Sequence, residues 1–251
     1  MTPREIALRA LNFEETEIVP VAGGLMQHVP FMARVLGISE EQWWEAPRKP
    51  LFAPCHEIGC HAILGPVMPK RSDETTTDAQ GRATDFRRAA KRPDMLTTPE
   101  EVAALAREAP SPQQVRAEFD AEETATEYRR RTVDTAREAG EMLVIPHILG
   151  WAPGFPTSDG AFSYEAFLMA CALYTDDMAR LFRSWGETSR LRFEAVARVV
   201  EEHDLPRIAW IGQDICERNG PVLSPELLER LYFPQLESAI EPLKRAGMKV
   251  V

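Results

Sequence analysis

Short apolar runs alternate with helical segments along this chain, and this alternation limits its fold more than any other feature. The runs have the length of strands, and each ends near Gly, Pro or a polar residue. Parallel strands joined by helical crossovers produce this order, so the sequence predicts an α/β fold. The predicted strands are Ile18–Gly23, Ala62–Val67, Met142–Leu149 and Arg207–Asp214, with a further apolar run from Met248.

Several predicted helices begin with the same capping signal. A hydroxyl residue at the N-cap is followed by proline at the first helical position and by an acid or amide at the third, which satisfies the free amides reciprocally. Gly140 and Gly247 follow helices, where a left-handed residue favours the turn into a strand. The capping signals are Thr2-Pro3-Arg4-Glu5, Thr98-Pro99-Glu100-Glu101 and Ser111-Pro112-Gln113-Gln114.

Three longer stretches have patterns of their own. Residues 70–88 are polar and predict a surface hairpin that turns near Gln80-Gly81. Residues 113–139 are strongly charged and predict one long helix with a broad solvated face. Leu227–Ala246 predicts a helix that bends at its two prolines.

As a TIM-type (β/α)₈ barrel, one of the folds that this alternation allows, the chain would be incomplete. Such a barrel needs eight strands to bury its interior, and about five are present, the last one cut short. No repeat or shift in composition marks a boundary, so residues 1–251 are expected to form a single domain that lacks its C-terminal strands.

Charge and composition exclude some classes of function. A net charge of −10 argues against a general nucleic-acid binder, which needs clustered Lys and Arg. No apolar run reaches the roughly 18 residues of a membrane span, and the N-terminus lacks the apolar core of a signal peptide. Four cysteines without an export signal indicate reduced thiols, so we expect a cytoplasmic enzyme.

The order and spacing of several segments resemble the uroporphyrinogen decarboxylase superfamily, over nearly the whole chain. The resemblance implies a TIM-type barrel. Members of this superfamily decarboxylate a tetrapyrrole, or move methyl groups to and from corrinoid proteins and thiols, often with zinc. The segments are residues 2–21, residues 56–64, Trp210-Ile211-Gly212-Gln213-Asp214-Ile215, Asn219-Gly220-Pro221, Ser224-Pro225-Glu226, Pro234 and residues 246–251.

The loop after the first strand favours one branch of that superfamily. Uroporphyrinogen decarboxylases carry an Arg-rich loop there that grips substrate carboxylates, since several carboxylates in one pocket require permanently charged partners. Residues 23–30 contain no Arg, and the family's acid on the second strand is replaced near His61. The resemblance therefore implies the methyltransferase branch, with a small methylated substrate or thiol and a corrinoid (cobalamin) protein as partner.

Two alternatives remain open. One is tetrapyrrole decarboxylation, as in porphyrin biosynthesis, for which Arg34 and Arg48 are the nearest basic candidates. The other is an inactive fragment of such a barrel. The zinc ligands of the methyltransferase branch would fall after Val251, so no residue of this sequence is assigned to a metal. Relatives also imply a homodimer.

Two residues at strand ends are the catalytic candidates. Asp214 ends a predicted barrel strand, where such folds place their chemistry, and its carboxylate can accept a proton or stabilise a developing cation. A helix cap or a pair with Arg218 is the structural alternative. His147 stands late in its strand and can act as an acid–base group or a ligand, with a half-buried structural histidine as the equal alternative.

Five residues are the substrate-binding candidates. Gln27 and His28 lie in the loop after the first strand, and loops over a barrel mouth often carry function. Gln213 stands beside Asp214. Trp151 and Tyr164 can form an aromatic wall for a flat or apolar substrate, and core or lid packing explains them equally.

Cys55 and Cys60 precede His61 and suggest a metal or haem site. On one continuous helix their thiols would lie about 140° apart and diverge, so we expect buried small apolar residues instead. Cys171 is expected in the core, and Cys216 is left open.

Overall fold

The computed structural model describes residues 1–24, 28–45, 49–65, 69, 95–146, 148–155 and 161–250. Helices and short strands follow one another within these ranges, which confirms the general prediction of an α/β fold. In the described part of the chain, no helix is long and apolar enough to cross a membrane.

All five predicted strands occur, although each is shorter than expected. The first three form a parallel sheet in the order β1-β2-β3, with Ala22 opposite Ala62 and Ile63 opposite Val144. A second parallel pair joins β4 and β7. The strands are β1 (Ala22–Gly23), β2 (Ala62–Leu64), β3 (Leu143–Ile145), β4 (Ile208–Ala209) and β7 (Lys249–Val250).

Both faces of the three-stranded sheet are covered, because alternate residues of a strand point to opposite sides. Ile63 and Val144 pack against buried residues of α2 (Val29–Leu36), α3 (Glu40–Glu45) and α4 (Lys49–Glu57). The opposite face presents Ala62, Leu143 and Ile145 to Ala7 of α1 (Pro3–Leu11) and to Ile208 of β4.

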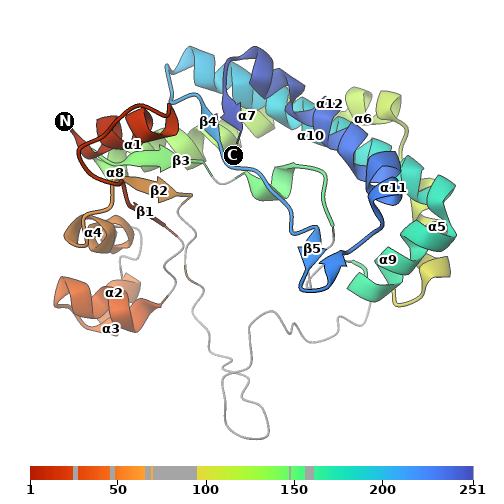
Figure 1. The fold of residues 1–251 in the computed structure, drawn as a ribbon, viewed down its shortest axis with the longest axis horizontal. Coiled ribbons are helices and arrows are strands. Elements are labelled where there is room, and N and C mark those ends of the chain that lie inside the picture. Colours follow the sequence, from red (N-terminus) through yellow and green to blue (C-terminus); the bar gives the residue numbers. More distant parts are fainter. Residues whose placement is uncertain are drawn as a thin grey trace, which may run out of the picture.

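The remaining helices form an arc beyond the sheet (Figure 1). The longest is α10 (Thr175–Glu202), and α12 (Phe233–Arg245) runs beside it. An antiparallel hairpin of β5 (Cys216–Glu217) and β6 (Gly220–Pro221) lies on the inner side of the arc. The other helices of the arc are α5 (Pro99–Glu108), α6 (Pro112–Glu118), α7 (Ala121–Arg129), α9 (Tyr164–Leu173) and α11 (Pro225–Leu227).

The predicted helix starts are confirmed. Thr2, Thr98 and Ser111 each cap a helix, and the side chain three residues later bonds back to the N-cap amide. Gly140 and Gly247 have positive φ angles of 64° and 70°, as expected between a helix and a strand.

The single long helix predicted over residues 113–139 is wrong. The chain forms α6, α7, a π-helical turn η1 (Arg130–Asp134) and α8 (Thr135–Ala139) instead. The helix stops because Phe119 is extended and the carboxylate of Asp120 accepts a hydrogen bond from the Glu123 amide at 2.8 Å. Aspartate competes for the backbone in this way, and it therefore begins a new helix.

The expected helix over residues 227–246 also contains a π-helical turn. It consists of α11, η3 (Leu228–Tyr232) and α12. Pro234 stands in the first turn of α12 and has no amide hydrogen to continue the preceding ladder, so the wider turn lies just before it. The hairpin expected near Gln80-Gly81 lies outside the described residues.

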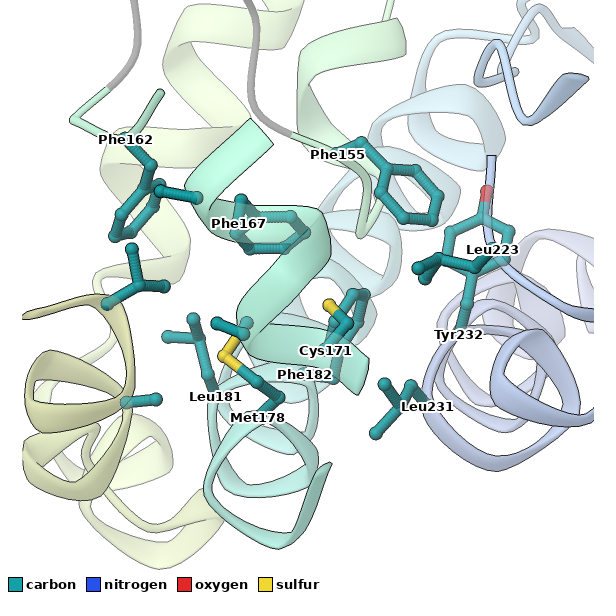
Figure 2. Close-up of a cluster of buried hydrophobic side chains, with 14 of the residues drawn as sticks. Phe155, Phe162, Phe167, Cys171, Met178, Leu181, Phe182, Leu223, Leu231 and Tyr232 are labelled. Atoms are coloured by element: carbon teal, nitrogen blue, oxygen red, sulfur yellow. The ribbon is translucent and has the colours of Figure 1, made fainter. Parts of the chain in front are cut away.

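An aromatic cluster fills the space between α9, α10 and η3 (Figure 2). Phe167 and Phe182 are fully buried, with ring centroids 5.9 Å apart. Phe155 lies 5.4 Å from the ring of Tyr232, which η3 carries into the cluster. Cys171 is buried within the same cluster, as predicted for a core position.

We expect the chain to lose stability at alkaline pH. Burial raises the pKa of the Cys171 thiol from 9.0 to about 12, and burial also raises the pKa of Tyr232 and of Tyr128. The folded chain holds these protons more tightly than the unfolded chain. Stability is therefore complete below about pH 9 and is lost as the pH rises through the folded pKa values, by about 1.4 kcal/mol per pH unit for Cys171.

Urea unfolding at about pH 8 and about pH 10.5 measures this slope. A Cys171→Ala chain is the control, because it removes one of the contributing groups and leaves the tyrosines. If both chains lose stability equally over this interval, the thiol makes no contribution.

Candidate functional site

Three ionisable or phenolic side chains lie close together beyond the end of β4. Asp214 is exposed and follows the strand, and Glu217 is exposed on β5. Burial, then the charge of Glu217, then that of Asp214 raise the pKa of Tyr164. The phenol of Tyr164 is therefore within electrostatic reach of both carboxylates. We call Tyr164, Gln213, Asp214 and Glu217 the carboxylate–tyrosine cluster.

The start of α9 fixes the position of Tyr164, its first residue. The Ser163 side chain caps the helix by accepting a hydrogen bond from the Ala166 amide at 3.2 Å. The Ser163 amide donates to the Leu96 carbonyl at 2.8 Å, which ties this helix start to the segment before α5. Tyr164 is 37% exposed, so its hydroxyl can reach solvent and a ligand.

The side chain of Gln213, which follows β4, packs against Gly154, which follows β3. The Cδ atom of the Gln213 amide lies 3.0 Å from the place of a β-carbon at Gly154. A larger residue at this position would displace the amide. The segments that follow the two strands therefore meet, as the carboxyl ends of parallel strands do in α/β enzymes.

The cluster lies beside the aromatic core. Ile215, directly after Asp214, packs against the same buried residues as Phe155, which directly follows Gly154. Phe155 contacts Phe167 edge-on, with centroids 6.1 Å apart. The polar groups thus stand at the edge of a rigid apolar support, an arrangement typical of ligand sites.

Among the described residues, Asp214 neither pairs with Arg218 nor caps a helix, because Ser224 caps α11. Asp214 therefore has neither of the two structural roles considered for it, the helix cap and the ion pair with Arg218. Gln213 is half-buried, and it points toward Gly154 rather than to solvent.

The other predicted site residues lie elsewhere. His28 is exposed and caps α2, since its Nδ1 accepts a hydrogen bond from the Phe31 amide at 3.1 Å. Trp151 is buried, with its ring 6.1 Å from Tyr128 and 5.9 Å from the Arg131 guanidinium. Its place is in the core, which was one of the two interpretations. Gln27 and His147 lie outside the described residues.

Sequence reasoning missed Glu217. Its signal was the Asn219-Gly220 pair, which is typical of a hairpin turn and folds the chain back just after Asp214. Gly220 has a φ of 133° at the end of that turn.

The described ranges contain no group of three His, Cys, Asp or Glu side chains placed to hold a metal ion. Comparison with protein-family models, with curated proteins and with solved structures gives no match for this chain.

Proposed function

We propose that this chain is built on the plan of a (β/α)₈ barrel and carries a methyl-transfer site of the uroporphyrinogen decarboxylase superfamily at its strand ends. Two observations carry the proposal: the carboxylate of Asp214 acts electrostatically on the Tyr164 phenol, and Gln213, beside Asp214, packs against Gly154 on the segment after β3. Functional groups of such barrels gather at this end of the strands.

The arrangement of the strands supports the barrel plan. Strands β1, β2 and β3 are neighbours in the order in which they occur in the chain, and all are parallel. Ile208 of β4 packs with Leu143 and Ile145, on the face of the sheet opposite α2 to α4, where Ala7 of α1 also packs. In a barrel, that face is the interior, and successive strands contribute to it in turn.

The charge of the site favours a small methylated substrate. Asp214 and Glu217 are both carboxylates, and the raised pKa of Tyr164 keeps its phenol protonated. A tetrapyrrole with several carboxylates would be repelled here, whereas a neutral or cationic methyl donor would not. This observation favours methyl transfer over the decarboxylation alternative.

In the proposed reaction, Asp214 accepts the proton of an acceptor thiol. The sulfur then attacks the methyl carbon, the new S–C bond forms, and the electron pair of the broken bond stays with the donor. Tyr164 donates a hydrogen bond to the donor or acceptor, and Gln213 orients it. A corrinoid protein is the proposed methyl donor. The described residues offer no fitting ligand group for zinc, so no step is derived through it.

Asp214→Asn is expected to lower the rate of thiol demethylation of methylcobalamin by about 10²-fold or more, because the amide cannot accept the thiol proton. The loss of methylcobalamin absorbance in the presence of a small thiol measures the rate. Asp134→Asn is the matched control, since that carboxylate, on the π-helical turn η1, lies away from the cluster and pairs with Arg137 at 3.4 Å.

The proposal fails if the unaltered chain shows no thiol-dependent demethylation, or if both variants slow the reaction equally. Conversion of uroporphyrinogen by the unaltered chain would establish the decarboxylation alternative in its place.

A further inference from the structure

Two buried cysteines share one space behind the end of β1. Cys55 and Cys60 are 2% and 3% exposed, and both are free thiols. A β-carbon at Gly23 would lie 2.8 Å from Sγ of Cys60 and 3.2 Å from Sγ of Cys55. Both sulfur atoms therefore occupy the room that the missing side chain of Gly23 leaves.

The end of α4 explains why these thiols meet. The Cys60 amide donates to the Cys55 carbonyl at 2.8 Å, and the Gly59 amide donates to the His56 carbonyl at 3.0 Å. With Gly59 at a φ of 75°, these are the two hydrogen bonds of a Schellman motif. That motif brings the residue after the glycine back over the residue five positions earlier.

The prediction that the two thiols diverge is therefore wrong. It assumed a helix continuing to residue 60, whereas α4 ends at Glu57. The backbone reverses its twist at Gly59, and Cys60 turns toward the helix rather than away from it.

The two thiols differ in how their surroundings affect them. Burial raises the pKa of both, that of Cys55 to about 11. For Cys60 the interaction with Cys55 opposes this rise, so we assign Cys60 as the nucleophile of the pair. Cys55 stands next to it as the resolving thiol.

We propose that Cys55 and Cys60 form a peroxide-sensitive site that closes reversibly to an intramolecular disulfide. The two sulfur atoms lie 2.8 Å and 3.2 Å from the same point, the place of a β-carbon at Gly23, and a backbone hydrogen bond holds their residues together, so closure requires little movement. At exposures of 2% and 3%, a bulky disulfide oxidant is hindered more than the small hydrogen peroxide molecule.

The chemistry proceeds in two steps. The Cys60 thiolate attacks one oxygen of hydrogen peroxide, so that an S–O bond forms, the O–O bond breaks and hydroxide leaves to become water. The Cys55 sulfur then attacks the Cys60 sulfur, the S–S bond forms, the S–O bond breaks, and the released hydroxide takes the remaining thiol proton. Two thiols and one peroxide give one disulfide and two waters, and an added dithiol reverses the reaction by exchange.

Treating the folded chain with hydrogen peroxide, then removing the oxidant and alkylating in denaturant, tests the site. The number of alkylated thiols should fall from four to two in the unaltered chain, and from three to one in a Cys216→Ser control. The peptide containing both cysteines should lose the mass of two hydrogen atoms and regain it with dithiothreitol. Circular dichroism before alkylation shows that the oxidised chain is still folded.

Two single variants separate the roles of the thiols. Cys55→Ser should stop at a sulfenic acid on Cys60, trapped by dimedone, and Cys60→Ser should leave Cys55 reduced. The proposal is overturned if both thiols stay reduced while Cys216 reacts, if Cys60 reaches the sulfinic acid without a cross-link, or if the cross-link forms only between chains. None of these outcomes depends on methyl transfer.

Discussion

Gly24→Ala is expected to destabilise the fold more than any other small substitution in the sheet. Gly24 has a φ of 113°, and an added β-carbon would lie 2.5 Å from the Leu64 carbonyl oxygen and 2.8 Å from the Leu64 amide nitrogen. Both atoms belong to the backbone of β2, which pairs with β1 on one side and β3 on the other. Backbone strain and overpacking together cost about 4 kcal/mol or more, a large share of a typical stability of about 5–15 kcal/mol.

Gly37→Ala separates the two contributions. Gly37 has a positive φ of 66° at the end of α2, but nothing lies within 4 Å of an added β-carbon. The Gly37→Ala chain should therefore lose only the stability that backbone strain costs, about 1 kcal/mol. Urea unfolding of both variants measures the difference. Equal losses would mean that the close approach of Gly24 to Leu64 does not restrain the sheet.

Local signals predicted this fold best. The reciprocal hydrogen bonds of Thr98 and Glu101 need only three neighbouring residues, so the sequence alone determines them. The strand positions were also predicted, because apolar runs between helices mark buried parallel strands. The lengths of the strands were not predicted, since strand ends depend on which neighbouring backbone groups are available for pairing.

The candidate site was predicted in part. Asp214 follows a strand end and could be selected by position, but its closeness to Tyr164 depends on the tie between Ser163 and Leu96. That contact joins segments far apart in the chain, and no local pattern reports it. The Cys55–Cys60 pair was missed for a different reason. Gly59 marks the end of the helix, but the prediction continued the helix to residue 60 and so gave a wrong angle between the two cysteine side chains.

Phe167→Ala is expected to cost about 3–5 kcal/mol, the typical range for a buried phenylalanine. Phe167 is fully buried on α9, with its ring stacked on Trp185 at 5.9 Å and 5.7 Å from Phe162. Removing the ring leaves a cavity in close-packed surroundings that cannot collapse without moving three helices. The midpoint of urea unfolding, with an unchanged slope, measures the loss.

Met169→Ala is the matched control, because Met169 lies on the same helix and is 44% exposed. This substitution should cost less than about 1 kcal/mol, since nearly half of the side chain is already in water. The comparison also tests the support of the candidate site. Phe155 contacts Phe167 and directly follows Gly154, against which Gln213 packs. If the aromatic core positions the carboxylate–tyrosine cluster, Phe167→Ala should slow the proposed reaction under conditions where the chain is still folded, and Met169→Ala should not.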